Sequence, residues 1–335
     1  MGDIALLIIS LGIILIGAEL FTNSIEWLGC KLKLGAGAVG SVLAAVGTAL
    51  PETMVPIIAI IGGGGSTAEH EVGIGAILGA PFMLATLAMF ITGLAALLFR
   101  RNNRPLLLDG RVVRRDLSFF LIVYSVAVLA SFLPNHGLKM VAALFLVGAY
   151  MFYVYQTFRA NHDGSTHQDQ LPALYLCRVT KRNAHDPSMG QIVIQIVLAL
   201  VAIILGAHEF VAGVESLAIA TGIPVFVLAL IITPIATELP EKFNSVIWVR
   251  RGKDTLAIGN ITGAMVFQSS IIPAIGIVLT SWQLDRLAIL SVVLALISAL
   301  LPYLSVRKKG VVFPAHLLLG GLFYLLFIIG VVAWH

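Results

Sequence analysis

The sequence predicts an all-α membrane protein of ten transmembrane helices, arranged as two inverted repeats of five helices each. Three observations support this fold class: the composition, the spacing of apolar stretches and an internal repeat. Mean hydropathy is +1.00, 59% of the 335 residues are hydrophobic and only 11% are charged. About a quarter of the residues in an ordinary soluble domain are charged. So little charge cannot cover a water-soluble protein of 35.7 kDa.

Apolar stretches of the length that a bilayer requires recur along the whole chain. A helix needs about 20 apolar residues to cross a hydrocarbon core of roughly 30 Å. Ten stretches meet this requirement, and they lie at 4–21, 36–61, 72–98, 117–133, 140–155, 192–210, 225–249, 256–279, 287–304 and 312–334.

The basic residues define the orientation of these ten spans. With the N-terminus outside, 18 of the 21 Lys and Arg residues fall in connections on the inner side. Lys139 and Arg286 fall outside, and Lys242 lies within a span. This asymmetry follows the positive-inside rule. It predicts an integral protein with both termini outside, and the compact chain suits the inner membrane of a prokaryote.

An internal repeat divides the chain into two similar halves. The segment at 17–28 resembles that at 206–217, and T-A-L-P-E at 48–52 resembles T-E-L-P-E at 237–241, both 189 positions later. A third pair, at 74–79 and 258–263, is 184 positions apart. Each half contains five spans, and because five is odd the second copy is inverted. The predicted domains are a first repeat at 1–158, a cytoplasmic linker at 159–190 and a second repeat at 191–335.

Several classes of protein are excluded by the motifs. Cys30 and Cys177 stand alone, which argues against a disulfide framework or a zinc site. No phosphate-binding loop and no nucleophile–base pair is visible, so we predict neither an ATP-driven pump nor an enzyme, and no cofactor. The pI near 9.1 reflects basic loops beside a lipid bilayer and not a nucleic-acid partner.

Two glutamates occupy equivalent places in the two halves. Glu52 lies past the middle of the second span, and Glu241 lies in the matching place of the seventh. A charge near the bilayer centre costs at least about 2.5–3.5 kcal/mol, so such residues face an interior or a cavity and usually serve function. The plain alternative is a buried ion pair. Thr48 and Thr237 lie four residues earlier, which places hydroxyl and carboxylate on one helix face, although threonine often bonds back to its own turn.

Prolines beside the glutamates add oxygen ligands. Pro51 and Pro240 lack an N–H group, so the carbonyls of Gly47 and Ala236 lose their usual donor. Inverted repeats place a substrate site near mid-membrane, where interrupted helices meet. Oxygens converging from two antiparallel helices suit a hard cation such as Ca²⁺.

Three further polar residues are candidates for the same cation site. Glu238 adds a carboxylate in the second half, or else it pairs with Lys242 four residues later. Gln268 and Asn260 either contribute amide oxygens or form hydrogen bonds between helices.

These motifs resemble the α-repeats of the calcium/cation antiporter superfamily. The resemblance rests on G-T-A-L-P-E at 47–52, A-T-E-L-P-E at 236–241 and I-G-N-I-T-G at 258–263. The sodium/calcium exchangers, whose repeats read G-T-S-L-P-E and then G-N-x-x-G-S-N, are the branch that the chain most resembles. The resemblance implies their ten-helix fold, with Glu52 and Glu241 as central Ca²⁺ ligands. It also implies that Thr48, Thr237 and nearby carbonyls complete the calcium and sodium sites.

The chain departs from this pattern at several ligand positions. The motif serine is replaced by Ala49 in one half and by Glu238 in the other. Residues 75–81 read G-A-I-L-G-A-P, without either asparagine, and the usual Asn or Asp of the third and eighth helices is Leu84 or Gln268. Both main calcium carboxylates remain, while several oxygens that help to bind sodium do not. The counter-ion is therefore open between Na⁺ and H⁺.

The predicted function is secondary antiport of cations. Facing carboxylates in a dry site repel each other unless a cation or a proton lies between them, so an empty carrier should cross rarely. We expect Ca²⁺ or a similar divalent cation to be exchanged for Na⁺ or H⁺ by alternating access. The alternative is a passive divalent-cation channel or permease lined by the same glutamates.

Overall fold

The structure, a computed structural model, describes residues 2–32, 49–62, 67–99, 105–106, 108–160, 172–179 and 187–334. Within these ranges the chain is helical, apart from connecting segments and an isolated antiparallel bridge between Leu106 and Val312. The elements of the first part are α1 (Gly2–Lys31), α4 (Leu50–Gly62), α5 (Thr67–Met83), the π-helix η2 (Leu84–Ala88), α6 (Met89–Phe99), α7 (Gly110–Leu129), the 3₁₀ turn η3 (Ala130–Phe132) and α8 (His136–Ala160). After the linker follow α9 (Tyr175–Val179), α10 (Met189–Thr221), α11 (Val225–Thr237), α12 (Leu239–Arg250), α13 (Asp254–Leu279), α14 (Arg286–Lys309) and α15 (Pro314–Trp334).

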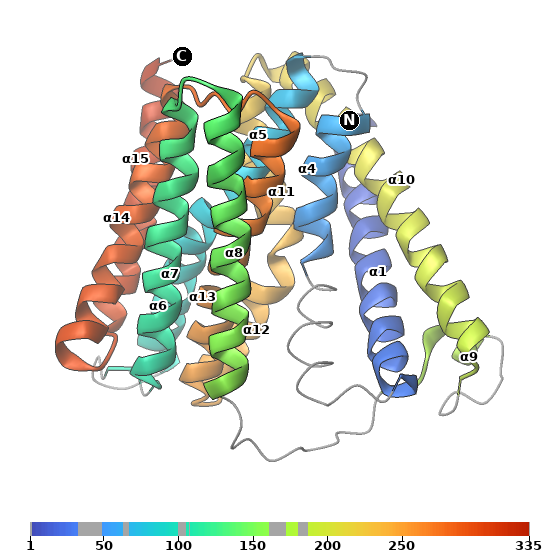
Figure 1. Cartoon of the computed structure of the whole chain (residues 1–335), viewed down its shortest axis with the longest axis horizontal. Helices are drawn as coiled ribbons and strands as arrows, with labels where there is room; N and C mark the ends of the chain where they lie inside the picture. The colour runs from blue at the N-terminus through green and yellow to red at the C-terminus, as the bar shows by residue number, and fades with distance from the viewer. Residues whose placement is uncertain are drawn as a thin grey trace.

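The helices have the length and composition of membrane spans. Among the described residues, seven helical segments are long and apolar enough to cross a bilayer: Ile4–Lys31, His70–Phe99, His136–Thr157, Met189–Thr221, Asp254–Leu279, Arg286–Lys309 and Pro314–Ala333. Shorter apolar helices at Leu50–Gly62 and Val225–Ile235 occupy parts of the second and seventh predicted spans, and α7 occupies the fourth. Figure 1 shows them gathered into one bundle. The prediction of an all-α membrane protein is thereby confirmed.

One of the predicted spans is interrupted, and another contains a change of helix type. The stretch at 225–249 was expected to form one helix, but α11 ends at Thr237 and α12 begins at Leu239, with Glu238 (φ −97°, ψ 7°) between them. Pro240 is the cause we assign, since proline lacks an N–H donor and suits the first turn of a helix better than its interior. The third span keeps its place but includes the π-helix η2.

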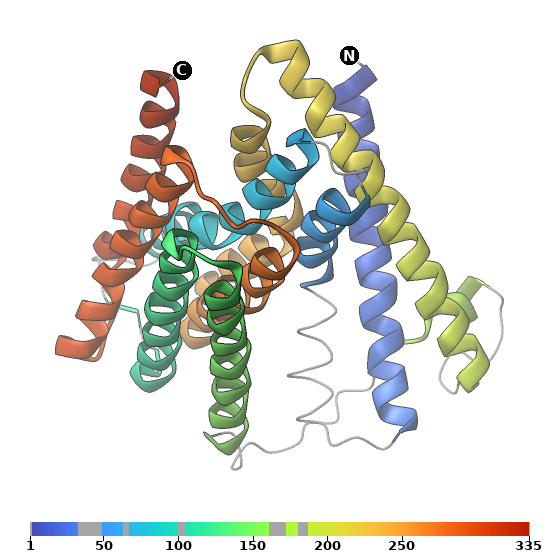
Figure 2. The ribbon, with the colours of Figure 1, turned by 45° about the horizontal axis from the view of Figure 1, so that its top comes forward.

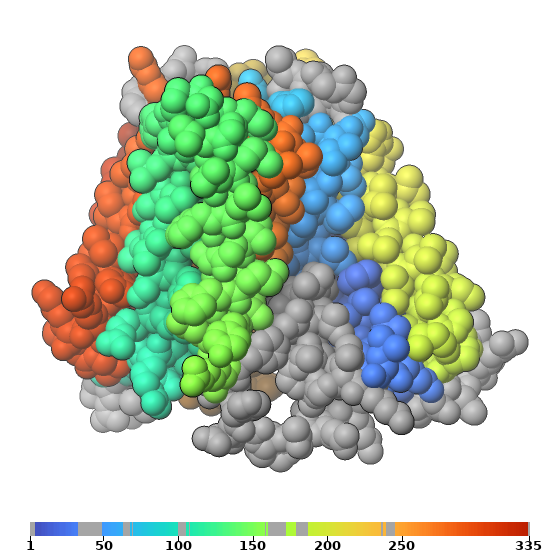
Figure 3. All heavy atoms as spheres, in the orientation of Figure 1, coloured from blue at the N-terminus to red at the C-terminus, as the bar shows by residue number. Residues whose placement is uncertain are grey.

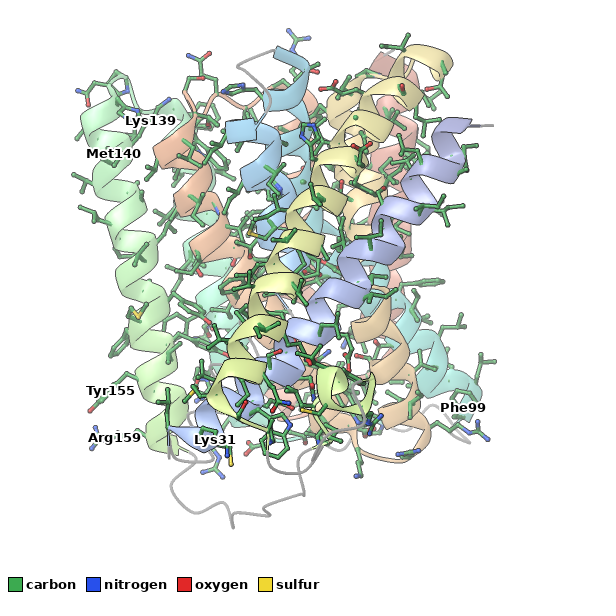
Figure 4. All side chains as sticks on the ribbon, turned by 90° about the vertical axis from the view of Figure 1, so that its right-hand side faces the viewer. Lys31, Phe99, Lys139, Met140, Tyr155 and Arg159 are labelled. Carbon is green, nitrogen blue, oxygen red and sulfur yellow. The ribbon has the colours of Figure 1, made fainter. Side chains whose placement is uncertain are left out.

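Basic side chains gather at one end of the bundle. In Figure 4, Lys31 and Arg159 lie at the same end as Phe99 and Tyr155, while Lys139 and Met140 lie at the opposite end. This is the distribution that the loop charges predict. The amine of Lys139 is held at its own end by the carbonyls of Ser281, 2.7 Å away, and Trp282, 3.2 Å away.

Helices α1 and α10 pack side by side in opposite directions (Figures 1 and 2). A Cβ atom placed on Gly17 would lie 2.7 Å from Cγ1 of Ile203, and one placed on Gly206 would lie 2.9 Å from Cγ1 of Ile14. Gly206 and Ile203 are the residues that follow Gly17 and Ile14 by 189 positions. The contact is therefore reciprocal: the same pair of positions meets twice, with the roles of the two helices exchanged.

The remaining helices form the main body, and their packing is also paired. Helix α4 packs on α5 as α12 packs on α13, and α7 packs on α8 as α14 packs on α15. Likewise α13 packs on α8 as α6 packs on α15. The largest apolar core lies mainly among α5–α8 and α12–α15, with contributions from α4 and α11. A second cluster joins α1, α4, α5, α10 and α11.

A short segment of the linker is docked on the α1–α10 pair. This segment belongs to the predicted linker at 159–190, yet Leu174 and Cys177 are fully buried. The indole N–H of Trp27 donates to the carbonyl of Pro172 at 2.9 Å. The side chain of Gln195 accepts from the N–H of Leu176 at 2.7 Å and donates to α1 at the carbonyl of Leu20, 3.0 Å away. Through these bonds the segment at 172–179 contacts both α1 and α10 at the basic end of the bundle.

Candidate cation-binding site

The two L-P-E motifs begin two helices in the same way. Leu50 and Leu239 are the first residues of α4 and α12, and a proline follows each. Glu52 and Glu241 are thus the third residues of their helices. Backbone N–H groups at a helix N-terminus lack intrahelical acceptors and carry positive partial charge, which favours a nearby carboxylate by about 0.3–1 kcal/mol. The local fold therefore offers each glutamate the same electrostatic support.

The first of these glutamates is buried. Glu52 is only 5% exposed. It projects from α4, which packs on α5, α10, α11 and α13. A carboxylate inside a bundle of apolar helices is costly, which is why buried acidic groups bind cations, accept protons or pair with bases. The prediction that Glu52 faces the protein interior is confirmed.

The interruption between α11 and α12 supplies a second set of oxygens. Thr237 and Glu238 are both buried, Glu238 to 1% exposure. The hydroxyl of Thr237 donates to the carbonyl of Thr233 at 3.1 Å, the bond within its own turn that threonine often makes in a helix. Its oxygen lone pairs are still available to a cation. Because the helix breaks at Glu238, the expectation that Thr237 and Glu241 share one continuous helix face is wrong.

Helix α13 contributes amide groups. Gln268 is buried and its Oε1 atom has no hydrogen-bond partner within the described part of the chain, and the same holds for the Nδ2 atom of the half-buried Asn260. Buried polar atoms are nearly always hydrogen-bonded in folded proteins. An amide oxygen without a donor inside an apolar bundle is available as a cation ligand.

Thr233 is a candidate that the sequence did not reveal. Its hydroxyl is buried one turn before Thr237, and no partner for it is found among the residues that the structure describes. A signal was present in the T-x-x-x-T spacing of 233–237. That spacing looks like an ordinary helix repeat, however, and the first half has Ala44 at the equivalent position.

Several predicted site residues are not described in full. Gly47 and Thr48 lie outside the described residues. For Ala236 and Glu241 only the backbone is described, in α11 and α12. The described donors are therefore the carboxylates of Glu52 and Glu238, the hydroxyls of Thr233 and Thr237, and the amides of Asn260 and Gln268. In that part of the chain no group of three or more His, Cys, Asp or Glu side chains comes together. The donors thus combine carboxylates with neutral oxygens, a set that suits hard cations.

A further buried carboxylate, outside this set of donors, lies on α7. Asp116 is almost completely buried and accepts hydrogen bonds from the hydroxyl of Thr262 at 2.8 Å and of Tyr153 at 3.1 Å. Arg115 pairs with it at 2.9 Å. Asp116 was not predicted as a buried residue, because the fourth span was expected to begin at 117.

Comparison with known proteins gives a consistent answer. A model of the family described as sodium/calcium exchanger protein matches residues 3–159 and 191–334. The protein CaxA of Alkalimonas amylolytica is 26% identical over 288 residues, which cover 85% of this chain and 84% of CaxA. The inner membrane protein YrbG of Escherichia coli strain K12 is 26% identical over 287 residues, with coverages of 85% and 82%.

Solved structures show the same fold. The crystal structure of the H⁺/Ca²⁺ exchanger CAX is similar with a TM-score of 0.70 at 19% identity, covering 98% of this chain and 82% of that one. A structure of the sodium-calcium exchanger NCX_Mj, soaked with Na⁺ and Sr²⁺, is similar with a TM-score of 0.57 at 19% identity, covering 98% of both chains.

Proposed function

This chain belongs to the sodium/calcium exchanger protein family, and on that premise we propose that it moves Ca²⁺, or a similar divalent cation, in exchange for Na⁺ or H⁺. The family consists of exchangers that carry ions without a bound cofactor, so the chain is a membrane transporter and not an enzyme. The observation that carries the proposal is the burial of Glu52 at the N-terminus of α4. We assign Glu52, Glu241, Thr48, Thr237 and Glu238 to the cation site. The carbonyls of Gly47 and Ala236 and the amides of Gln268 and Asn260 complete it.

The proposed architecture is ten spans in two inverted halves, at 1–158 and 191–335, joined by a linker at 159–190. The reciprocal contact between α1 and α10 supports it, because two antiparallel helices that exchange equivalent residues are related by a two-fold axis between them. The matched packing of α4 on α5 and of α12 on α13 supports it as well. In inverted repeats of this kind the substrate site lies close to that axis.

Exchange follows from the charge of the site. If Glu52 and Glu241 approach each other in a low-dielectric interior, their repulsion is relieved by a cation or by protonation of one of them. Closing the site with neither would bury uncompensated charge, at a cost of several kcal/mol per ion. Each crossing then requires a bound ion, so the movement of one cation is coupled to the return of another.

A passive channel lined by the same carboxylates is the second candidate. The interruption between α11 and α12 favours the carrier. Helices α4 and α12 both begin at an L-P-E motif, and the side chains of Glu52 and Glu238 at these helix ends are buried. Channels more often build their selectivity from rings contributed by several subunits.

The proposed topology places the basic end of the bundle in the cytoplasm. Lys31 and Arg159 lie at this end, and positive residues are retained on the cytoplasmic side. Both termini are then outside the cytoplasm, and we propose the inner membrane of a prokaryote as the location.

Uptake of ⁴⁵Ca²⁺ into proteoliposomes tests the function. We expect uptake that depends on an imposed outward gradient of Na⁺ or H⁺, and the two gradients applied separately identify the counter-ion. Glu52→Gln should abolish the uptake. Glu209→Gln, which removes an exposed carboxylate on α10, is the matched control and should leave it unchanged. Rapid Ca²⁺ entry without any counter-ion would refute antiport and establish the channel.

A further inference from the structure

A pocket at the basic end of the bundle lies between the beginning of α7 and the end of α14. Its volume is about 370 Å³. It is lined by Asp109, Arg111 and Arg114 on the α7 side and by Val306, Arg307 and Gly310 on the α14 side. Figures 1 and 3 show the two helix ends side by side at the lower left of the bundle. The cation site described above shares none of these residues.

The walls of the pocket are fixed by backbone contacts. Gly310 ends α14 in the left-handed region (φ 70°). A Cβ atom on Gly110 would lie 2.9 Å from the carbonyl oxygen of Gly310, so the two segments approach as closely as glycine allows. Beside them, the N–H of Leu106 donates to the carbonyl of Val312 at 2.9 Å. The pocket is therefore a junction between two connections that are far apart in sequence.

The charge of the pocket is positive. Three arginines and one acidic residue line it. Asp109 caps α7, where it accepts from the N–H of Arg111 at 2.9 Å, and it also pairs with the guanidinium of Arg111 at 3.6 Å. The net positive charge of the pocket is therefore that of Arg114 and Arg307. The N-terminus of a helix of 20 residues adds positive partial charge at the same place. Arginine binds phosphate groups through paired hydrogen bonds.

The arginines also continue the lipid-facing surfaces of the two helices. On α7, Arg111 shares a helix face with Ile122 and Leu129, which are 56% and 63% exposed. On α14, Arg307 follows Val293 and Leu300 on one face, at spacings of seven residues. Exposed apolar residues on spanning helices contact acyl chains. The arginines, at the ends of these helices, therefore lie at the level of the lipid headgroups.

We infer that this pocket binds the phosphate group of an anionic phospholipid, with the acyl chains of that lipid lying along the exposed faces of α7 and α14. Basic pockets between membrane helices on the cytoplasmic side are typical sites for such headgroups. The assignment does not depend on which cations are transported. The ligand we assign is a lipid and not a free phosphate, because only a lipid has acyl chains that can contact the apolar faces running into the pocket.

Native mass spectrometry of the detergent-solubilised protein tests the inference. The probes are phosphatidylglycerol and a phosphatidylcholine with the same acyl chains. The pocket variant is Arg114→Gln with Arg307→Gln. The control variant is Arg251→Gln with Lys253→Gln, which removes two exposed charges from the same end of the bundle outside the pocket. Loss of two charge-assisted hydrogen bonds should reduce retention of phosphatidylglycerol at least about tenfold in the pocket variant.

We expect the control variant and the wild type to retain phosphatidylglycerol equally, and neither to retain phosphatidylcholine. Phosphatidylglycerol should also raise the melting temperature of the wild type and of the control but not that of the pocket variant. A cooperative melting transition in each variant shows that it is folded. An equal loss in the control variant would overturn the inference by showing a general charge effect. Displacement of the lipid by millimolar glycerol 3-phosphate would overturn it by showing a site for a soluble phosphate.

Discussion

The hydroxyl of Thr262 on α13 donates a hydrogen bond to Oδ2 of Asp116 on α7, 2.8 Å away and out of contact with solvent. Oδ1 of the same carboxylate accepts from Tyr153 on α8 and from Arg115. One acidic side chain thus joins three helices. Thr262 lies two residues after Asn260, a predicted ligand. The hydrogen bond to Asp116 therefore fixes the axial position and the rotation of this segment of α13 relative to α7.

Replacing Asp116 should destabilise the fold. Asp116→Leu removes the common acceptor and leaves the buried hydroxyls of Thr262 and Tyr153 without it, at a cost of about 1–3 kcal/mol. Asp116→Asn keeps a carbonyl oxygen for Thr262 and should cost less. Thermal unfolding in detergent measures both, and Ser118→Ala, on the same helix but bonded only to its own turn, is the control. Equal melting temperatures for Asp116→Leu and the wild type would show that the junction contributes nothing.

A methyl group at Gly79 should disrupt the packing of α5 on α11. A Cβ atom there would lie 2.3 Å from the carbonyl oxygen of Leu230 and 2.8 Å from Cγ of Pro234. Neither atom belongs to a flexible side chain, so the helices must separate, and overpacking of this kind costs about 1–3 kcal/mol. Gly148→Ala on α8, where nothing lies within 4 Å, should be neutral or stabilising. The two melting temperatures decide the matter, and an unchanged value for Gly79→Ala would contradict the close approach.

Two buried glutamines should respond differently to the same substitution. The Oε1 atom of Gln268 has no partner in the described residues, so Gln268→Leu should leave stability unchanged or raise it. If that oxygen is a cation ligand, the KM for Ca²⁺ should rise about tenfold, as expected for the loss of about 1.4 kcal/mol of binding.

Gln195→Leu is the comparison for Gln268→Leu. Its amide accepts from Leu176 and donates to Leu20 and Asn23, so this variant should lower the melting temperature. Proteoliposome uptake at graded Ca²⁺ concentrations, together with thermal unfolding, provides both readings. A lowered melting temperature with an unchanged KM in Gln268→Leu would show that its amide is structural.

The hydrogen bond between Tyr175 of α9 and Glu19 of α1 should be lost at alkaline pH. The phenol of Tyr175 donates to Oε1 of Glu19 at 2.8 Å, and this hydrogen bond, with a smaller effect of burial, raises the pKa of Tyr175 above its usual value. Because the folded pKa exceeds the unfolded value of about 10, the stabilisation is complete below pH 10. It is lost as the pH rises through the folded pKa. The difference in absorbance at 295 nm between wild type and Tyr175→Phe follows this titration, and a midpoint at or below pH 10 would contradict it.

The sequence was sufficient to locate the helices and the first carboxylate. Apolar length alone located the described spanning helices, because a bilayer imposes a similar minimum length on every span. Two ends were placed too early: α1 extends to Lys31 and α10 to Thr221, beyond the predicted ends at 21 and 210. The burial of Glu52 could also be predicted, because exposing a single acidic side chain in such a stretch to lipid is energetically costly.

What the sequence could not predict depends on tertiary contacts. The break at Glu238 is compatible with either a kinked or an interrupted helix, because proline signals both. The docking of 172–179 was not predicted, because a short apolar segment such as Leu174–Cys177 shows no pattern of its own. Its position depends on hydrogen bonds with Trp27 and Gln195, which are distant in sequence. Asp116 was overlooked for a similar reason: its partners Tyr153 and Thr262 lie 37 and 146 positions away.

The contact in which Gly17 meets Ile203 while Gly206 meets Ile14 has the form of an isologous dimer interface. In such an interface a single surface is complementary to itself. A shorter polypeptide containing one half of this chain, with glycine and isoleucine three residues apart, would already possess both sides of the contact. Two copies of such a polypeptide, inserted in opposite orientations, would make the same contact without a covalent connection.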